Sequence, residues 1–540
     1  MVYAFSLPTT SPLSFQTFIS SSTHPSLPQS ASTSRHALRL ALKAHKRLPR
    51  GARQDAHLPT VLSALQDYLP YLSAISHGLR GQSIKTNSLP GSHYASYNTS
   101  ENQPRASEEI EITLRAEIES AWKPTLSTGN TLNLNSSAGI KSNGKGVRAR
   151  GGRTSGKGIN FEIAFTLTTL GYVLSRLARA SVVQSVYAPV TQTPEQRTAA
   201  VQTATRHLLQ ASSVHGLLAS SPSFSVANSG STSVSDIETT TQSALASLAL
   251  AEATLLAVLK DDAYVAACIQ ARNPNDREWM VKAPDIPKVR ALLFARLCVR
   301  AAEYAEQAAA GLGSVGSDKG SRLDDEITRY AGVLGRVARA RACRFFGIDA
   351  ELAGKCGEGI AWLRAARTQL GLRGTGSAGS DDPSGAPATS KSGFSRLKRE
   401  WTERREEKKI GKDAGGGRSE KGLLEPGDDA GRDEEGRVIT MLETKWVRMN
   451  DTINTQAIPP SAPLLSNLPS GRDIHTPPAA YNLPSMDADQ LILMRAPPNE
   501  DENISFADDP DDSDEDFSPE TRGTPGGFPD RSDTASTAYY

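Results

Sequence analysis

Apolar residues recur at helical spacing over most of the chain between residues 160 and 372. The first helix carries an apolar stripe in which steps of four and three alternate: Ile163, Leu167, Leu170, Leu174 and Leu177. From Gln242 to Leu259 the pattern is apolar on nearly all sides, with Glu252 as its one charge. We expect this helix to lie between others at the centre of the fold.

Further helices are predicted after Pro194, from Ile286, from Asp324, around Leu352 to Leu370, and over 433–454. The helix from Asp324 begins with acidic residues and is expected to end at the basic residues Arg339, Arg341 and Arg344, the charge order that complements a helix dipole.

Other stretches depart from the helical pattern. Residues 108–117 alternate between apolar and polar side chains, which predicts a half-buried strand. Segments rich in Gly, Ser and Pro predict flexible insertions at about 127–158, 372–393 and 411–431. Residues 476–540 contain an acidic run from Asp508 to Asp516 and few apolar residues to offset the entropy of ordering, so we expect a disordered acidic and Pro-rich tail.

Charge and cysteine usage exclude several classes of protein. The chain has 60 Lys and Arg against 59 Asp and Glu, so bulk basicity does not indicate nucleic acid as a partner. No window reaches the ~18 uninterrupted apolar residues of a membrane span, so no transmembrane segment is expected. The four cysteines lie within apolar helical patterns at spacings that fit neither a zinc site nor a redox pair; they are Cys268, Cys298, Cys343 and Cys356.

One glycine-rich run has the spacing of a phosphate-binding loop. Gly151 to Lys157 reads G-x-x-x-x-G-K, but Gly158 stands where a Ser or Thr hydroxyl should reach Mg²⁺, and the preceding residues do not predict a buried strand. We therefore expect a flexible basic loop here, with nucleotide binding as the alternative.

No residue pattern predicts catalysis, a cofactor or a bound metal. The motifs G-x-S-x-G and H-E-x-x-H do not occur, and the nine histidines are scattered without ligands at suitable spacing. Glu252 is the residue whose predicted burial would change its chemistry, because burial raises the pKa of a carboxylate. We expect an Arg side chain or a backbone amide from a neighbouring helix to satisfy it, which makes Glu252 a structural buried charge.

Five runs together resemble the Bro-type domain of Alix-like, ESCRT-associated proteins. They are GINFEIAFTLTTLGYVLSRLARA (158–180), ALASLALAEATLLAVLK (244–260), PKVRALLFARLCVRAAEYAEQA (287–308), RACRFFGIDAELAGKCGEGIAWLRAA (341–366) and WVRMNDTINTQAIPP (446–460). The resemblance implies a mainly α-helical fold, an extended boomerang-shaped solenoid with a TPR-like core and a small N-terminal β-sheet. It also implies one such domain over residues 1–475, followed by the tail at 476–540.

The resemblance implies a scaffold, and no enzyme. Bro-type domains bind the amphipathic C-terminal helix of an ESCRT-III subunit in a hydrophobic patch on their concave face. We nominate Leu245, Leu248 and Leu255 on the central helix for this patch. The alternative that these leucines are ordinary core residues stays open.

Two further runs, 275–298 and 470–476, resemble the fungal branch of this family that responds to ambient alkaline pH. That branch implies an adaptor that helps bring a calpain-like protease to the transcription factor PacC for proteolytic activation. The implied location is cytoplasmic, with recruitment to endosomal or plasma-membrane ESCRT assemblies. The alternatives are a general endosomal ESCRT adaptor with other partners and a nucleotide-dependent enzyme that uses the run from Gly151 to Lys157.

Overall fold

The computed structural model describes residues 2–85, 107–128, 152–188, 193–227, 234–270, 288–315, 322–372, 429–476 and 478–498. Over these residues the chain is mainly α-helical with short strands, which confirms the fold class expected from the sequence. Most of the two insertions expected at 372–393 and 411–431 lies outside the described residues, as does the acidic run from Asp508 to Asp516.

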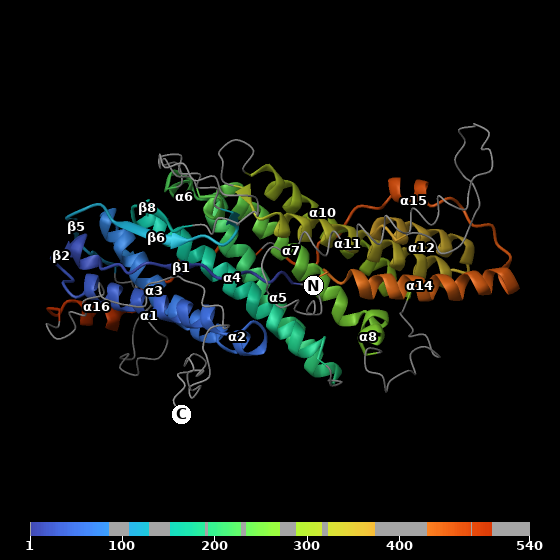
Figure 1. Ribbon diagram of the computed structural model, residues 1–540, viewed down its shortest axis with the longest axis horizontal. Coiled ribbons are helices and arrows are strands. Elements are labelled where there is room, and N and C mark those ends of the chain that lie inside the picture. Colours follow the sequence, from blue (N-terminus) through green and yellow to red (C-terminus); the bar gives the residue numbers. More distant parts are fainter. Residues whose placement is uncertain are drawn as a thin grey trace, which may run out of the picture. The chain divides into compact units, whose positions relative to one another are not determined.

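Within the described residues, seven long helices from Ile159 onward follow one another, and each packs mainly on its neighbours in sequence (Figure 1). This order of packing is that of a helical solenoid. The helices are α4 (Ile159–Ser185), α5 (Pro194–Ser220), α7 (Thr239–Asp261), α10 (Lys288–Ser314), α11 (Asp325–Leu352), α12 (Cys356–Leu370) and α14 (Arg432–Met449). The short helices α6 (Pro222–Ala227), α8 (Ala263–Gln270) and α15 (Ala462–Ser466), and the π-helical turn η3 (Asn450–Asn454), lie between or after them.

Three helices precede this series. They are α1 (Leu27–Arg47), α2 (Ala52–Ala56) and α3 (Leu58–Leu79). Helix α1 packs on α3, and α3 packs in turn on α4, so the N-terminal helices extend the same stack.

Local signals in the sequence determine several helix ends. Asp324 accepts a hydrogen bond from the backbone amide of Glu326 at 3.1 Å and caps α11. Thr193 and Gln196 form a capping box at the start of α5. Helix α12 ends where Gly371 takes a φ of +68°, a left-handed conformation that favours glycine.

The strands in the described ranges form four small antiparallel sheets. Strands β1 (Thr9–Thr10), β6 (Glu119–Lys123) and β8 (Thr154–Lys157) form a three-stranded sheet in the order β1-β6-β8. The pairs are β2 (Ile19–Ser21) with β5 (Ile112–Leu114), β3 (Ile84–Lys85) with β4 (Ser107–Glu108), and β7 (Ser127–Thr128) with β9 (Arg322–Leu323). The strand expected over 108–117 is therefore shorter than predicted.

The insertion expected at 127–158 begins and ends in strands, which corrects that expectation. Its first residues form β7, and its last residues form β8, which pairs with β6 along four residues. Hydrogen bonds to a neighbouring strand order these polar residues, although their composition resembles that of a loop. Residues 129–151 lie outside the described part of the chain.

Two clusters of buried side chains form the core. One surrounds α1, α3 and the first half of α4, and the other follows α7, α10, α11, α12 and α14. Helix α7 is the one described helix long and apolar enough to cross a membrane by length and composition, but 78% of that window is buried inside the protein. Its packing between α5 and α10 accounts for its apolar surface.

A buried carboxylate joins the N-terminal elements. Glu162 on α4 receives hydrogen bonds from Arg35 (Nε–Oε1 2.8 Å), from Tyr68 (Oη–Oε1 3.0 Å) and from Trp122 (Nε1–Oε2 2.7 Å). Burial alone would raise the pKa of Glu162, but the charge of Arg35 lowers it overall. Helices α1, α3 and α4 and strand β6 are therefore held by one ionised group.

A second buried network holds the other end of the solenoid. Arg344 on α11 bonds both Glu435 on α14 and Asp262 beside α7, and Arg341 donates to Glu435 at 2.9 Å. Burial would raise the pKa of Glu435, but Arg344 and Arg341 lower it overall. The expectation that α11 ends at these arginines is wrong, because α11 continues to Leu352 and both side chains are fully buried.

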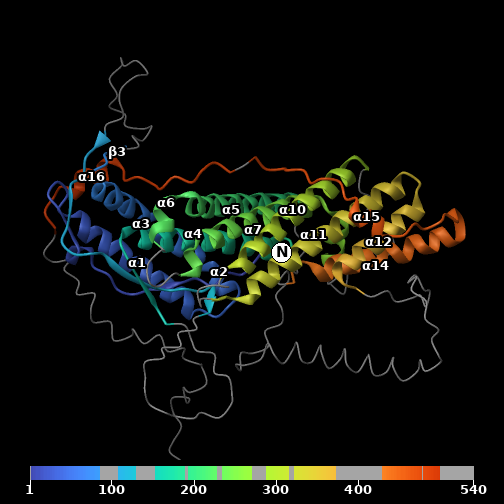
Figure 2. The same ribbon diagram turned by 90° about the horizontal axis from the view of Figure 1, so that it is seen from above.

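The C-terminal segment folds back along the helices. Figure 2 shows it running from α15 to α16 (Ala488–Met494), next to α1 and α3. Met486 and Leu491 are buried in the N-terminal cluster, and the amide of Ser26 donates to the carbonyl of Met494 at 3.3 Å. The first part of the tail expected from residue 476 therefore belongs to the folded part, where apolar contacts and hydrogen bonds hold the segment.

Candidate functional site

The leucines nominated for partner binding lie in the core. Leu245, Leu248 and Leu255 are 2%, 1% and 0% exposed and belong to the cluster around α7. Helix α7 is covered on one side by α5 and on the other by α10. The three leucines therefore do not form an exposed patch. They are core residues, which was the alternative left open by the sequence.

Glu252 fastens the N-terminal segment to α7. Its Oε1 accepts hydrogen bonds from the Tyr3 backbone amide at 2.9 Å and from the Tyr330 hydroxyl of α11 at 3.0 Å. Arg179 donates to the carbonyl of Val2 at 2.8 Å, and its positive charge lowers the pKa of Glu252. Burial raises the pKa of Glu252 to about 7, against the opposing effect of these hydrogen bonds. The backbone amide expected from a neighbouring helix thus comes from the extended N-terminus.

The run that has phosphate-loop spacing is part of a sheet. Residues Thr154 to Lys157 form β8, whose backbone pairs with β6, so these amides do not surround a phosphate. Lys157 Nζ lies 3.0 Å from the carboxylate of Glu117, and both side chains are exposed. Gly151 lies outside the described residues. The alternative of nucleotide binding at this run is therefore not supported.

The described residues contain no group of three or more His, Cys, Asp or Glu side chains that could hold a metal ion. The four cysteines are buried, and none of them forms a disulfide within the described residues. Burial raises the pKa of Cys298 and of Cys343 to about 12, which keeps both thiols protonated and unreactive near neutral pH.

An exposed apolar patch lies on the first two turns of α10. Val289, Leu292 and Leu293 are 87%, 46% and 36% exposed. Their spacing of three and four residues puts them on one face of the helix, while Ala291, on another face, is buried. Exposed apolar side chains that adjoin one another mark interaction sites more often than single ones do.

The same face of α10 continues under the C-terminal segment. The amide of Arg472 donates to the carbonyl of Arg296 at 3.1 Å, and Asp473 accepts from Arg300 Nε and from the Tyr304 hydroxyl, both at 2.7 Å. A Cβ on Gly471 would lie 2.6 Å from the backbone of Arg300, so the chain passes too close for any side chain there. The C-terminal segment therefore contacts this face from Arg296 to Tyr304 and leaves the patch of Val289, Leu292 and Leu293 exposed.

Sequence reasoning missed this patch. The adjacent Leu292 and Leu293, followed by the buried Phe294, were a usable signal, because three consecutive large apolar side chains cannot all point to one face of a helix. The arrangement offers apolar anchors for a helical ligand and contains no group that could carry out a reaction.

Comparison with known proteins gives a relative that matches over full length. The chain is 56% identical over 546 residues to the pH-response regulator protein palC of Emericella nidulans, and the match covers 100% of both chains. No family model matches the chain.

Solved structures give weaker matches. An ALIX BRO1–CHMP4C complex is 15% identical with a TM-score of 0.47, covering 90% of this chain and 98% of that one. A structure on endosomal targeting by the Bro1 domain is 13% identical with a TM-score of 0.44, covering 92% of this chain and 95% of that one.

Proposed function

The chain belongs to the family of the pH-response regulator protein palC, and from this premise we propose that it is a scaffold in ambient alkaline-pH signalling. The observation that carries the proposal is the identity of 56% over the full length of both chains. In this role the chain brings other proteins together and needs no catalytic group of its own.

The first partner in this proposal is an ESCRT-III subunit. Its amphipathic C-terminal helix would place apolar side chains on Val289, Leu292 and Leu293 of α10, the patch of the described residues that best suits helix recognition. Complete burial of a large apolar side chain contributes roughly 1.5–3 kcal/mol, and Val289, at 87% exposed, has the most surface left to bury. The three residues therefore serve as anchors, and the rest of the interface contributes toward the cost of association.

Through that subunit the chain acts at endosomal or plasma-membrane ESCRT assemblies and helps recruit a calpain-like protease to PacC. The runs 275–298 and 470–476 support this branch of the family. The alternative is a general ESCRT adaptor with other partners. It predicts normal PacC processing in cells that lack the protein.

The binding step is tested with the purified full chain and a fluorescently labelled peptide of the ESCRT-III C-terminal helix. Val289→Asp with Leu292→Asp should weaken binding at least tenfold, because two charges replace exposed apolar anchors. The matched control is Ile453→Asp with Ile492→Asp, which changes two side chains that are 74% and 58% exposed elsewhere. If the α10 variant and the control bound the peptide with equal affinity, α10 would not be the binding site.

A further inference from the structure

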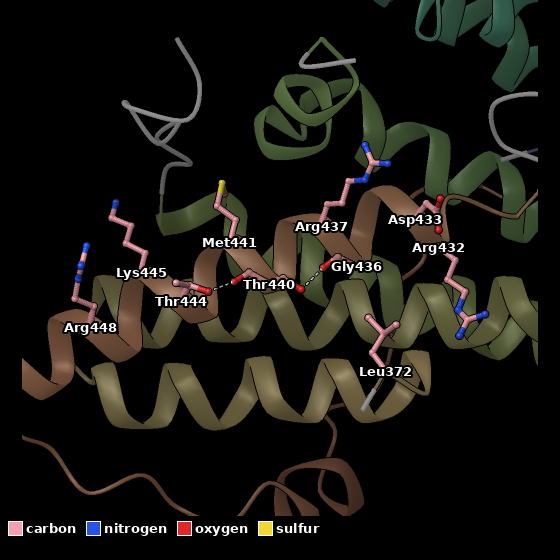
Figure 3. Close-up of a pocket in the computed structure, with 10 residues that line it drawn as sticks. All are labelled: Leu372, Arg432, Asp433, Gly436, Arg437, Thr440, Met441, Thr444, Lys445 and Arg448. Carbon is pink, nitrogen blue, oxygen red and sulfur yellow. Dashed lines mark hydrogen bonds between the residues drawn. The ribbon is translucent and has the colours of Figure 1, made fainter. Parts of the chain in front are cut away.

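The outer face of α14 is hollowed into a cavity of about 1020 Å³. Its lining comes from the length of α14 between Arg432 and Arg448, and from Leu372, which lies two residues after the end of α12 (Figure 3). The cavity belongs to neither the α10 patch nor the buried ion networks. It is therefore a second open surface, at the opposite end of the helical series from α4.

The floor of this cavity is apolar. Gly436 has no side chain, and a Cβ there would lie 3.2 Å from the Leu372 side chain. Thr440 and Thr444 turn their hydroxyls onto the carbonyls one turn earlier, both at 2.8 Å, as the dashed lines of Figure 3 show. Met441 is half-buried beside them. The floor thus offers apolar contact and few free hydrogen-bonding groups.

Three basic side chains lie along one side of this floor. Arg437, Lys445 and Arg448 point to the same side of α14 as Met441, at steps of four, four and three residues (Figure 3). All three are exposed, and none forms an ion pair with a carboxylate in the described part of the chain. Glu443, on the inner side of α14, pairs instead with Arg367 at 2.6 Å. Asp433 is the one acidic residue among the described lining.

We propose that this face of α14 binds an acidic amphipathic peptide segment of a partner protein. Its apolar side chains lie over Gly436 and Met441, and its carboxylates face Arg437, Lys445 and Arg448. From Arg437 to Arg448 the helix rises about 16 Å, which matches about three turns of a bound helix.

The chemistry of the face favours a peptide over the other anionic ligands. A nucleic-acid surface needs cations without an apolar floor between them, and aromatic side chains for stacking are not among the lining residues. A membrane surface needs apolar side chains that protrude, whereas Met441 is half-buried and Gly436 forms a hollow. An apolar floor beside a row of cations complements an acidic helix with apolar anchors.

The test uses the full chain and a labelled synthetic helix of three Leu-Glu-Glu-Ala-Leu-Glu-Glu heptads as the probe, with a version carrying Lys for Glu. The acidic helix should bind and the basic one should not, and affinity should fall as salt rises. Arg437→Glu with Lys445→Glu and Arg448→Glu should weaken binding at least tenfold. Met441→Ser should also weaken binding, because it removes the apolar contact and leaves the charges of the three cations unchanged.

The matched control reverses three exposed arginines elsewhere, Arg50, Arg329 and Arg336, and makes the same change in net charge. Equal losses in both triple variants, no loss in either, or binding of the basic helix would each overturn the proposal. Binding to vesicles that contain phosphatidylserine without binding to the acidic helix would also overturn it. The result does not depend on the ESCRT-III peptide, because the α10 variant should bind the acidic helix normally.

Discussion

Glu252 should make the stability of the folded chain fall as pH rises from about 4.5 to 7. Its pKa is about 7 in the folded chain against an ordinary 4.5. Between these values the folded chain holds one proton more than the unfolded chain, so the free energy of unfolding decreases with rising pH. The two pKa values differ by about 2.5, which corresponds to about 3 kcal/mol of unfolding free energy because one pKa unit is worth about 1.36 kcal/mol. Above pH 7 this contribution is lost and no longer changes.

Glu252→Gln isolates this effect. The amide keeps an oxygen that can accept from the Tyr3 amide and the Tyr330 hydroxyl, but it does not titrate in this range. The free energy of unfolding of the variant, minus that of the wild type, should rise by about 2–3 kcal/mol between pH 5 and pH 8. This rise is expected whether the variant is more or less stable than the wild type at pH 5. Urea unfolding followed by circular dichroism at several pH values measures this. Parallel pH profiles for the two proteins would refute a titrating Glu252.

Glu252→Ala removes the acceptor as well as the charge. The Tyr3 amide and the Tyr330 hydroxyl then lose a buried partner, at roughly 1–3 kcal/mol each. The alanine variant should therefore be less stable than the glutamine variant at every pH, and partner binding should survive in its folded fraction. Full stability together with abolished binding would show that Glu252 contacts the partner.

Three other substitutions test the packing. Arg344→Ala leaves the carboxylates of Glu435 and Asp262 buried without their shared cation, so urea unfolding should show a loss of about 3–5 kcal/mol, and a loss below 1 kcal/mol would contradict the network. Leu248→Asp should lower the free energy of unfolding by several kcal/mol, because it buries an unpaired charge. A variant that stays folded but has lost binding would mean that Leu248 is exposed. Gly471→Ala should detach residues 470–473 from α10 and raise amide hydrogen exchange there, whereas unchanged exchange would argue against the close contact with Arg300.

The long helices could be predicted because their signals are local. A stripe at steps of four and three is visible in Ile163 to Leu177 whatever surrounds the helix, and an all-round apolar helix such as α7 must lie between others. The caps at Asp324 and Gly371 likewise depend on residues close in sequence. The mainly α-helical character of the fold follows from these elements, whereas the extended solenoid was implied by the family resemblance.

The binding face could not be predicted in the same way. Leu245 and Leu292 occupy similar sequence patterns, yet one is buried and the other is exposed, because exposure depends on which helices pack against each face. The partners of the buried charges also could not be predicted without the fold. Arg341 and Arg344 resemble a basic helix end, and their partners Glu435 and Asp262 are more than 80 residues away in the sequence.

PacC processing in cells tests the central claim, that the chain is a scaffold in alkaline-pH signalling, most directly. A strain lacking the protein is shifted to alkaline pH and complemented with the wild type, with the α10 variant Val289→Asp and Leu292→Asp, or with the control Ile453→Asp and Ile492→Asp. We expect processed PacC to be absent in the deletion strain and with the α10 variant, and restored by the wild type and by the control. Normal processing of PacC in the deletion strain would contradict the account.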